Sequence, residues 1–312
     1  MKAGVIGVGV MGEHHARVYN ELEDVQLAGV SDINEEMGQK VAQKFETQFY
    51  PHFTDLLEEV DIVTIAVPTS LHKEVALKAA EIGVDMLIEK PIAESLESAE
   101  QIIRAGEENN VKIMVGHIER FNPAVVKLKE IVEQGVLGDI ISIHGRRIGP
   151  HSPRIRDVGI IVDLAVHEID IFTHIFGQRA EEVYAIAGNS FHTSEDYASI
   201  LLRFPNNHSG MIETNWLSSK KMRDMDVIGS KCIAQLDLLG QKVNLIQNDG
   251  LVELEVDHIE PLKKELMQFI NCIRNDVIPC PSGKDGAHVL NVAVSAIKSY
   301  MEKKVITLNG KY

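Results

Sequence analysis

The chain has 312 residues, with 31 Lys or Arg against 46 Asp or Glu, so its formal net charge is −15. This length favours two domains that share a cleft, and the acidic balance argues against a nucleic-acid-binding face over most of the surface. The three cysteines, Cys232, Cys272 and Cys280, lack a CxxC spacing, so no disulfide framework or cysteine zinc site is expected. Because no signal peptide or membrane span is evident, we expect a cytoplasmic protein without nucleic-acid or membrane partners.

Up to about residue 117, short β-rich apolar runs alternate with helical patterns. Such alternation is typical of a parallel sheet with crossover helices. The expected strands are 3–7, 25–30, 48–50, 62–67, 85–89 and 112–115. Six such strands predict a doubly wound sheet of the Rossmann type, and we assign residues 1–118 to this first domain.

The first strand-to-helix turn contains Gly7, Gly9 and Gly12 in GxGxxG register, within "GVIGVGVMGEHHARVY". In this context the first glycine permits a tight turn, the second lets a pyrophosphate approach the backbone, and the third allows close packing. Val10 and Met11 lie between them, where the start of a helix offers N–H groups to phosphate. The motif predicts a dinucleotide site.

Asp32 ends the second expected strand, twenty residues beyond Gly12. A carboxylate at this place can accept hydrogen bonds from the ribose hydroxyls of the adenosine. No arginine follows in "SDINEE" to hold a 2′-phosphate, and the carboxylate would repel one. The pattern therefore favours NAD over NADP, although a structural glycine turn with a helix-capping Asp32 is the alternative.

Two further strand ends carry polar residues. Glu89, Lys90 and Pro91 follow the fifth strand at the edge where open α/β sheets bind ligands. An oxidised nicotinamide disfavours a protonated lysine beside it, so Lys90 is a candidate proton donor or acceptor. We expect a cis Lys90–Pro91 bond to orient the lysine, with an exposed Glu/Lys pair as the alternative.

After the fourth strand comes "VPTSLH", which makes Pro68, Thr69 and His72 plausible neighbours of the cofactor, together with Glu89. His72 fits equally well as a residue at a helix start that contacts no ligand.

After residue 118 the alternation changes. A helical stretch at 123–134 is followed by strand-like runs between about 181 and 256 without intervening helices, and two amphipathic stretches, 261–275 and 286–303, close the chain. This order predicts a C-terminal α+β domain, residues 119–312, with an open and mostly antiparallel sheet. We expect that sheet to pair subunits into a homodimer or homotetramer, because a broad apolar face needs a cover.

Within the second domain, residues 158–177 are apolar except for Asp163, His167, Asp170 and His174, which share one helical face. A single polar stripe indicates a buried helix that lines a wet cavity. His167 is the candidate base, oriented by Asp163 one turn earlier. Asp163 and His167 could share a cation, but no third ligand is evident, so we expect no metal site.

Just before this helix, "HGRRIGPHSPRIRDVG" concentrates Arg146, Arg147, Arg154 and Arg156 in a strongly acidic chain. Guanidinium groups match phosphate oxygens bidentately, so the cluster suits a pyrophosphate-bearing substrate better than a neutral polyol. Surface arginines paired with nearby carboxylates are the alternative reading.

Together these motifs resemble the Gfo/Idh/MocA oxidoreductases, the family of glucose-fructose oxidoreductase and inositol dehydrogenase. The resemblance covers the whole chain and rests on "GVGVMGEHHARVY", "VPTSLH", "EKP", "GHIERFNP" and "DLAVHEID". It implies hydride transfer between a sugar carbon and NAD, with Lys90 and His167 flanking the reacting hydroxyl. It also implies that Asp163 bonds to His167 or to the sugar.

A narrower resemblance rests on "GHIERFNP" combined with the arginine-rich stretch, and it is to the UDP-N-acetylglucosamine 3-dehydrogenase branch. It implies oxidation of the C3 hydroxyl of that nucleotide sugar. Arg120 and Asn122 would then lie at the junction of substrate and cofactor, with Asn122 on the cofactor side. Arg147, Arg154 and Arg156 are the candidates for the diphosphate.

Three alternatives share the core motifs. An inositol or aldose dehydrogenase would differ only in its substrate pocket. A hexosaminuronate dehydrogenase would need a further cation for the extra carboxylate. A non-catalytic NAD-dependent sensor would have no need of Lys90, Asp163 and His167 as a proton-transfer set, so their presence argues against it.

Overall fold

The computed structural model describes residues 1–151, 158–247, 250–308 and 310. The chain divides into two compact units. The first comprises Met1–His117 and Leu262–Ala287, and the second comprises Ile118–Pro261 and His288–Tyr312. No helix in the described part of the chain is long and apolar enough to cross a membrane.

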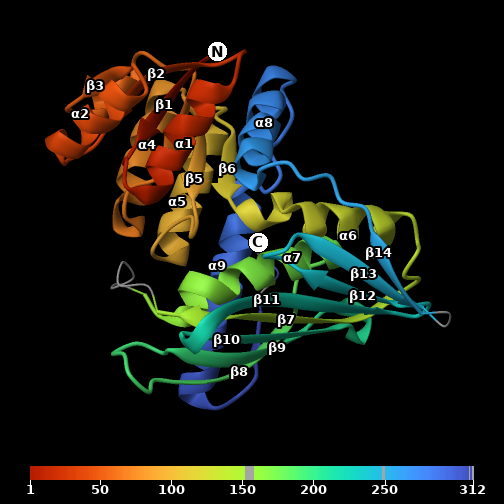
Figure 1. Ribbon diagram of the computed structural model, residues 1–312. Coiled ribbons are helices and arrows are strands. Elements are labelled where there is room, and N and C mark those ends of the chain that lie inside the picture. The colour runs from red at the N-terminus through yellow and green to blue at the C-terminus, as the bar shows by residue number, and fades with distance from the viewer. Residues whose placement is uncertain (152–157, 248–249, 309, 311–312) are drawn as a thin grey trace. The chain divides into compact units, whose positions relative to one another are not determined.

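Six parallel strands form the sheet of the first unit, in the order β3-β2-β1-β4-β5-β6 (Figure 1). They are β1 (Lys2–Ile6), β2 (Gln26–Ser31), β3 (Gln48–Tyr50), β4 (Ile62–Ile65), β5 (Asp85–Glu89) and β6 (Ile113–Gly116). Between them lie α1 (Val10–Glu21), α2 (Glu35–Lys44), α3 (Phe53–Leu57), the short 3-10 turn η1 (Thr69–Leu71), α4 (His72–Ile82) and α5 (Leu96–Glu108). The predicted doubly wound sheet is confirmed, and its switch point lies between β1 and β4.

The central strands of this sheet are almost continuously buried, as their apolar runs predict. Because β-α-β crossovers are right-handed and the chain leaves β1 in both directions, α1 and α2 cover one face while α4 and α5 cover the other. The carboxyl ends of β1, β2, β4 and β5 therefore meet at one edge, where the predicted cofactor residues follow the strands.

Residues 262–287, which include α8 (Pro261–Arg274) apart from its first residue, pack with the first unit, whereas the sequence pattern assigned all of 119–312 to the second. The reason is the exposed edge of the parallel sheet at β6. Val115 N donates to Pro281 O over 3.1 Å, and Gly286 lies against the Val115 side chain. The chain thus returns to cover an edge strand whose backbone groups would otherwise be unpaired.

Nine strands form the sheet of the second unit, in the order β14-β13-β12-β11-β7-β10-β9-β8-β15 (Figure 1). They are β7 (Ile140–Pro150), β8 (Glu182–Gly188), β9 (Tyr197–Arg203), β10 (Ser209–Asn215), β11 (Leu217–Gly229), β12 (Ile233–Asp237), β13 (Lys242–Gln247), β14 (Gly250–Leu254) and β15 (Ile306–Thr307). Only the β7/β10 pair among these neighbours is parallel. The mostly antiparallel sheet is confirmed.

The helical elements of this unit are η2 (Ile118–Phe121), α6 (Pro123–Glu133), the π-helix η3 (Ile161–Ala165), α7 (Val166–Phe176), the short turn η4 (Pro205–Asn207) and, from His288 onward, α9 (Gly283–Glu302). Side chains from α6, α7 and α9 join the inward residues of the strands in one core, which includes Leu128, Phe172, Val227 and Val292. Along β9 buried and exposed residues alternate strictly, so only one face of the sheet lies under helices.

Candidate functional site

The glycine loop between β1 and α1 leaves room for a ligand at one glycine only. Gly7 has φ of +84°, and a Cβ there would lie 2.7 Å from the backbone of Ala66 and Val67. A Cβ on Gly12 would lie 1.8 Å from Gly7 O, whereas a Cβ on Gly9 would meet nothing within 4 Å. Gly7 and Gly12 are therefore required by the fold, and Gly9 leaves the backbone open to approach.

Helix α1 begins at this open position. Its N-cap residue is Gly9, which has no side chain to bond the first N–H groups, and Val10 and Met11 form the first turn. Val10 is half exposed. Uncapped N–H groups at the start of a helix attract an anion, so the loop fits the pyrophosphate of a dinucleotide.

Asp32 directly follows β2 and is tied to the same loop. Its Oδ2 accepts a hydrogen bond from Val8 N over 2.7 Å, and its Oδ1 accepts one from Asn34 N over 2.8 Å. A carboxylate has about four lone-pair positions, so two acceptor positions remain for ribose hydroxyls. The half-buried Asp32 thus both anchors the glycine loop and fits the expected ribose contact.

Pro68 and Thr69 lie at the turn η1 after β4, at the expected edge of the sheet. His72 does not present its ring there. The residue is 1% exposed, with Nδ1 3.0 Å from Pro91 O and Nε2 3.0 Å from Val67 O. Burial lowers the pKa of His72. His72 therefore ties the loops after β4 and β5 together, as a residue at a helix start that contacts no ligand would.

Glu89 points inward, toward α1, and not outward as an exposed Glu/Lys pair would. Its Oε1 lies 2.8 Å from His15 Nε2, and Tyr19 OH lies 3.0 Å from Thr64 Oγ1, which approaches His15 Nδ1 at 3.5 Å. Burial opposes charge on Glu89, but the hydrogen bond and charge of His15, together with Lys90, lower the pKa of Glu89. A buried polar chain thus ends beside Lys90, whose peptide bond to Pro91 is cis as expected.

In the second unit, the residues of "IERFNP" form internal contacts. Arg120 donates to both oxygens of Asp170, over 2.7 and 2.6 Å, and both residues are buried. Asn122 caps α6 by accepting from Ala124 N, and its amide donates to Glu119 Oε2 and to Leu238 O. Both side chains fasten η2 and α6 to α7 and the sheet, and the substrate contact of Arg120 and the cofactor contact of Asn122 stay predictions.

The guanidinium of Arg147 also bonds to carboxylates within the protein. Its Nε donates to Glu168 Oε1 over 2.6 Å and its Nη1 to Glu119 Oε1 over 2.9 Å, and its side chain is 2% exposed. Burial raises the pKa of Glu168 against the effect of Arg147. For Glu119, Arg147 and Arg223 outweigh burial and lower the pKa. Arg147 is therefore a buried ion-pair residue in this structure, and its contact with the diphosphate stays a prediction.

The other arginines of the predicted cluster lie elsewhere. Arg146 points to the opposite face of the sheet from Arg147, where its Nη2 donates to Asp224 Oδ2 over 2.5 Å and its side chain is 42% exposed. Arg154 and Arg156 lie outside the described residues. The arginine cluster of the sequence is therefore not one surface in the described part of the chain.

The predicted polar stripe is helical but begins with a π-turn. Asp163 lies in η3 and His167 in the first turn of α7, both half-buried, and π-turns within helices are frequent at functional sites. Glu195 holds the start of this helix, because Ile160 N donates to Glu195 O and Ile161 N to its Oε1. Asp170, by contrast, is the buried partner of Arg120.

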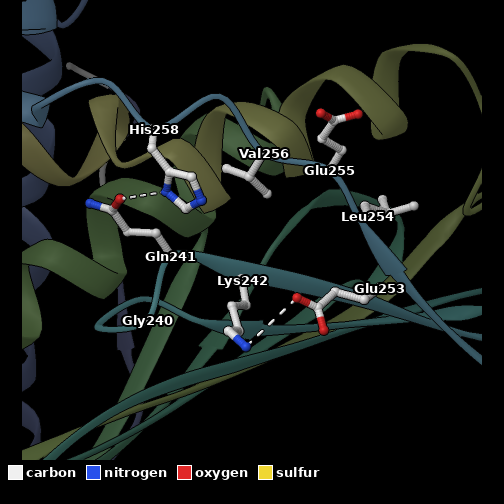
Figure 2. Close-up of a pocket in the computed structure, with 8 residues that line it drawn as sticks. All are labelled: Gly240, Gln241, Lys242, Glu253, Leu254, Glu255, Val256 and His258. Carbon is white, nitrogen blue, oxygen red and sulfur yellow. Dashed lines mark hydrogen bonds and ion pairs between the residues drawn. The ribbon is translucent and has the colours of Figure 1, made fainter.

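A cavity of about 440 Å³ opens in the second unit at the β13–β14 hairpin (Figure 2). Its lining includes the ion pair Lys242–Glu253 and the hydrogen-bonded pair His258–Gln241. None of the predicted site residues lines it. We therefore do not assign the substrate to this cavity.

Sequence reasoning missed His15, Glu119, Glu168, Glu195 and Arg223 as parts of these networks. A signal existed for Arg223, because in "MRDMDV" it shares the inward face of a strand with Met225 and Val227. His15 likewise falls on the apolar face of α1 with Val18 and Tyr19. A polar residue at a buried position of a periodic pattern predicts a partner, but the pattern does not say which.

The Rossmann unit, its open glycine loop and the lysine at the end of β5 define a dinucleotide-binding oxidoreductase. Two family models match the chain: the oxidoreductase family with an NAD-binding Rossmann fold over residues 1–117, and the GFO/IDH/MocA C-terminal domain over residues 125–235. The chain belongs to the Gfo/Idh/MocA oxidoreductase family, as its motifs predicted. NAD is the cofactor of its Rossmann unit, as the glycine motif and its context predicted.

Relatives of full length include different sugar dehydrogenases. UDP-N-acetylglucosamine 3-dehydrogenase of Acidithiobacillus ferrooxidans is 29% identical over 316 residues, which are 97% of this chain and 99% of the relative. A solved structure of that enzyme has a TM-score of 0.90 and covers 96% of this chain and 97% of its own. Myo-inositol 2-dehydrogenase of Thermotoga maritima is 26% identical over 332 residues, 99% of this chain and 98% of the relative. The family likeness therefore supports a sugar dehydrogenase.

Proposed function

We propose that the protein is an NAD-dependent dehydrogenase that oxidises the C3 hydroxyl of UDP-N-acetylglucosamine to the 3-keto nucleotide sugar. The observation that carries the proposal is the full-length similarity to an enzyme of that name. It is supported by the half-buried Asp163 and His167 on one helix and by Lys90 at the ligand-binding edge of the Rossmann sheet.

Each residue has a distinct role in the proposed reaction. The first turn of α1 holds the pyrophosphate, and Asp32 accepts hydrogen bonds from the adenosine ribose. Bound NAD supplies the acceptor for the hydride that leaves the sugar carbon. His167 removes the hydroxyl proton, or Lys90 does so through a shared hydrogen bond, while Asp163 orients the imidazole or the sugar.

The first experiment tests substrate and chemistry together. Purified protein is mixed with NAD and, separately, UDP-N-acetylglucosamine, UDP-glucose, N-acetylglucosamine and myo-inositol, and reduced cofactor and product mass are followed. We expect loss of two hydrogens from UDP-N-acetylglucosamine alone. Adding 2-oxoglutarate reveals cofactor that stays bound and is reoxidised in place. If no sugar reduced the cofactor, the result would favour a non-catalytic NAD-dependent sensor instead.

A paired substitution tests the base. His167→Ala should leave NAD binding intact and lower kcat by about 10²-fold or more, on the usual scale for a general base. His174→Ala is the matched control, because His174 lies two turns further along the same helix. Turnover at the wild-type rate in His167→Ala would refute the assignment of the base.

An inositol dehydrogenase is the second candidate, favoured by the full-length likeness to the Thermotoga maritima enzyme. The same assay separates the two. Oxidation of myo-inositol without oxidation of any nucleotide sugar would keep the roles of Lys90 and His167 and remove the diphosphate from the substrate.

We also propose that the protein is a cytoplasmic homodimer or homotetramer that pairs through the open face of the nine-stranded sheet. Leu201 and Met211 lie opposite each other on that face, exposed by 51% and 47%, and Ile186 on the next strand is 60% exposed. An exposed apolar patch of this kind marks an interaction surface, which a second subunit would remove from water. Light scattering coupled to gel filtration should show a dimer or tetramer, and Leu201→Glu should shift it toward the monomer.

A further inference from the structure

Arg223 on β11 lies on the side of the sheet that α7 covers. It is the residue directly opposite Arg147 in the antiparallel β11/β7 pair, and opposite residues of such a pair point to the same face. Met225, two residues further along β11, is buried on this face. Arg223 is therefore an inward-facing cation on β11. The neighbouring strand β7 precedes the helix that carries Asp163.

The two opposed arginines differ in how far they reach the surface. Glu119 Oε1 accepts from Arg147 Nη1 over 2.9 Å and from Arg223 Nη1 over 3.0 Å. The Arg147 side chain is 2% exposed, but that of Arg223 is 32% exposed. One edge of the Arg223 guanidinium is thus held by a buried carboxylate, while part of the group remains accessible.

The surroundings of Arg223 connect it with the polar stripe. Burial and the charge of Arg147 lower the pKa of Arg223, while Glu119, Glu168 and Asp163 oppose that effect. The hydrogen bonds make the same connection, because Arg147, which shares Glu119 with Arg223, also donates to Glu168, the residue that follows His167 on α7. A guanidinium that is fixed at one edge and partly accessible is pre-organised to bind a phosphate group through its remaining N–H donors.

We infer that Arg223 forms the phosphate-binding part of the substrate site and selects a nucleoside diphosphate sugar over a neutral sugar. This inference rests on the proposed function. Glu119 holds the guanidinium so that its accessible edge faces the ligand, and Arg147 supports Glu119 from within. Arg223 takes the role that the sequence assigned to Arg147.

Titration calorimetry of the protein saturated with NAD tests the inference, with UDP and uridine as the two probes. The wild type should bind UDP much more tightly than uridine, because only UDP carries the diphosphate. Arg223→Gln should weaken UDP binding by about tenfold or more, equivalent to about 1.4 kcal/mol, and leave uridine binding unchanged. Arg223→Lys should recover part of the loss.

Arg146→Gln is the matched control, because Arg146 lies on the opposite face of the same sheet. In turnover, Arg223→Gln should raise KM for the nucleotide sugar with little change in kcat, whereas a merely structural role would lower the melting temperature and uridine binding as well. An unchanged preference for UDP over uridine in Arg223→Gln would overturn this inference and leave the proposed function standing. A wild type that binds UDP no better than uridine and oxidises only neutral sugars would overturn both.

Discussion

His15 Nε2 lies 2.8 Å from Glu89 Oε1, although the two residues are 74 positions apart in the sequence. His15 belongs to the helix that starts at the glycine loop, and Glu89 directly precedes Lys90. The pair therefore joins the helix that is proposed to hold the cofactor phosphates to the strand end that carries the proposed proton-transfer lysine. The two side chains are 0% and 12% exposed, so neither can replace its partner with bulk water.

Removing the imidazole should destabilise the protein. His15→Phe fills a similar volume but leaves the Glu89 carboxylate buried without its partner, which costs about 1–3 kcal/mol. His15→Gln keeps a side-chain donor and should lose less. Urea denaturation of both variants measures the difference. Equal stability of His15→Phe and the wild type would show that the pair does not support the fold.

The same pair predicts a dependence on pH. The pKa of Glu89 is held below its ordinary value of 4.5, because His15 and Lys90 outweigh burial. The stability that Glu89 contributes is therefore present above that ordinary value and is lost as the pH falls through the lowered pKa. The unfolding free energy of the wild type should exceed that of Glu89→Gln at neutral pH, and the gap should narrow in acid. A gap that widens in acid would contradict the sign of the shift.

The glycine loop predicts that two similar substitutions have different effects. Gly9→Ala adds a Cβ where nothing lies within 4 Å, so stability should stay within about 0.5 kcal/mol of the wild type. NAD affinity should nevertheless fall about tenfold or more, because the methyl group occupies the path of the pyrophosphate.

Gly12→Ala is the contrasting variant. Its Cβ would lie 1.8 Å from Gly7 O, so the backbone must shift, at a cost of about 1–3 kcal/mol. Calorimetric NAD binding and thermal denaturation of both variants check the pair. If Gly9→Ala bound NAD like the wild type, the open position would not be the pyrophosphate site.

Much of the fold followed from local pattern. The short apolar runs and the glycine turn of residues 1–117 predicted all six strands within two residues or fewer at each boundary, whereas the order of the strands in the sheet comes from the structure. The return of residues 262–287 to the first unit was not predicted. It depends on a contact between Val115 and Pro281, and an amphipathic helix pattern does not identify the surface that it covers.

Some residues of the candidate site could likewise be predicted from local pattern, and others could not. Gly9 and Asp32 could be predicted because their roles depend on spacing along one strand-turn-helix unit. The arginines could not be sorted by sequence, because Arg146 and Arg147 are adjacent in a strand and point to opposite faces. Which face is buried depends on where α7 packs, and hence on contacts far away in the chain.

The buried ion pairs predict that Arg147 and Arg146 contribute very differently to stability. Arg147→Met leaves Glu119 without one partner and Glu168 with an uncompensated charge, so the unfolding free energy should fall by about 3–5 kcal/mol. Arg146→Met removes an exposed pair with Asp224 and should cost no more than about 1 kcal/mol. Guanidinium chloride denaturation of the two variants measures both values. If Arg147→Met kept the stability of the wild type but raised KM for the nucleotide sugar alone, Arg147 would return to the substrate site, and the buried network would not be what keeps it in place.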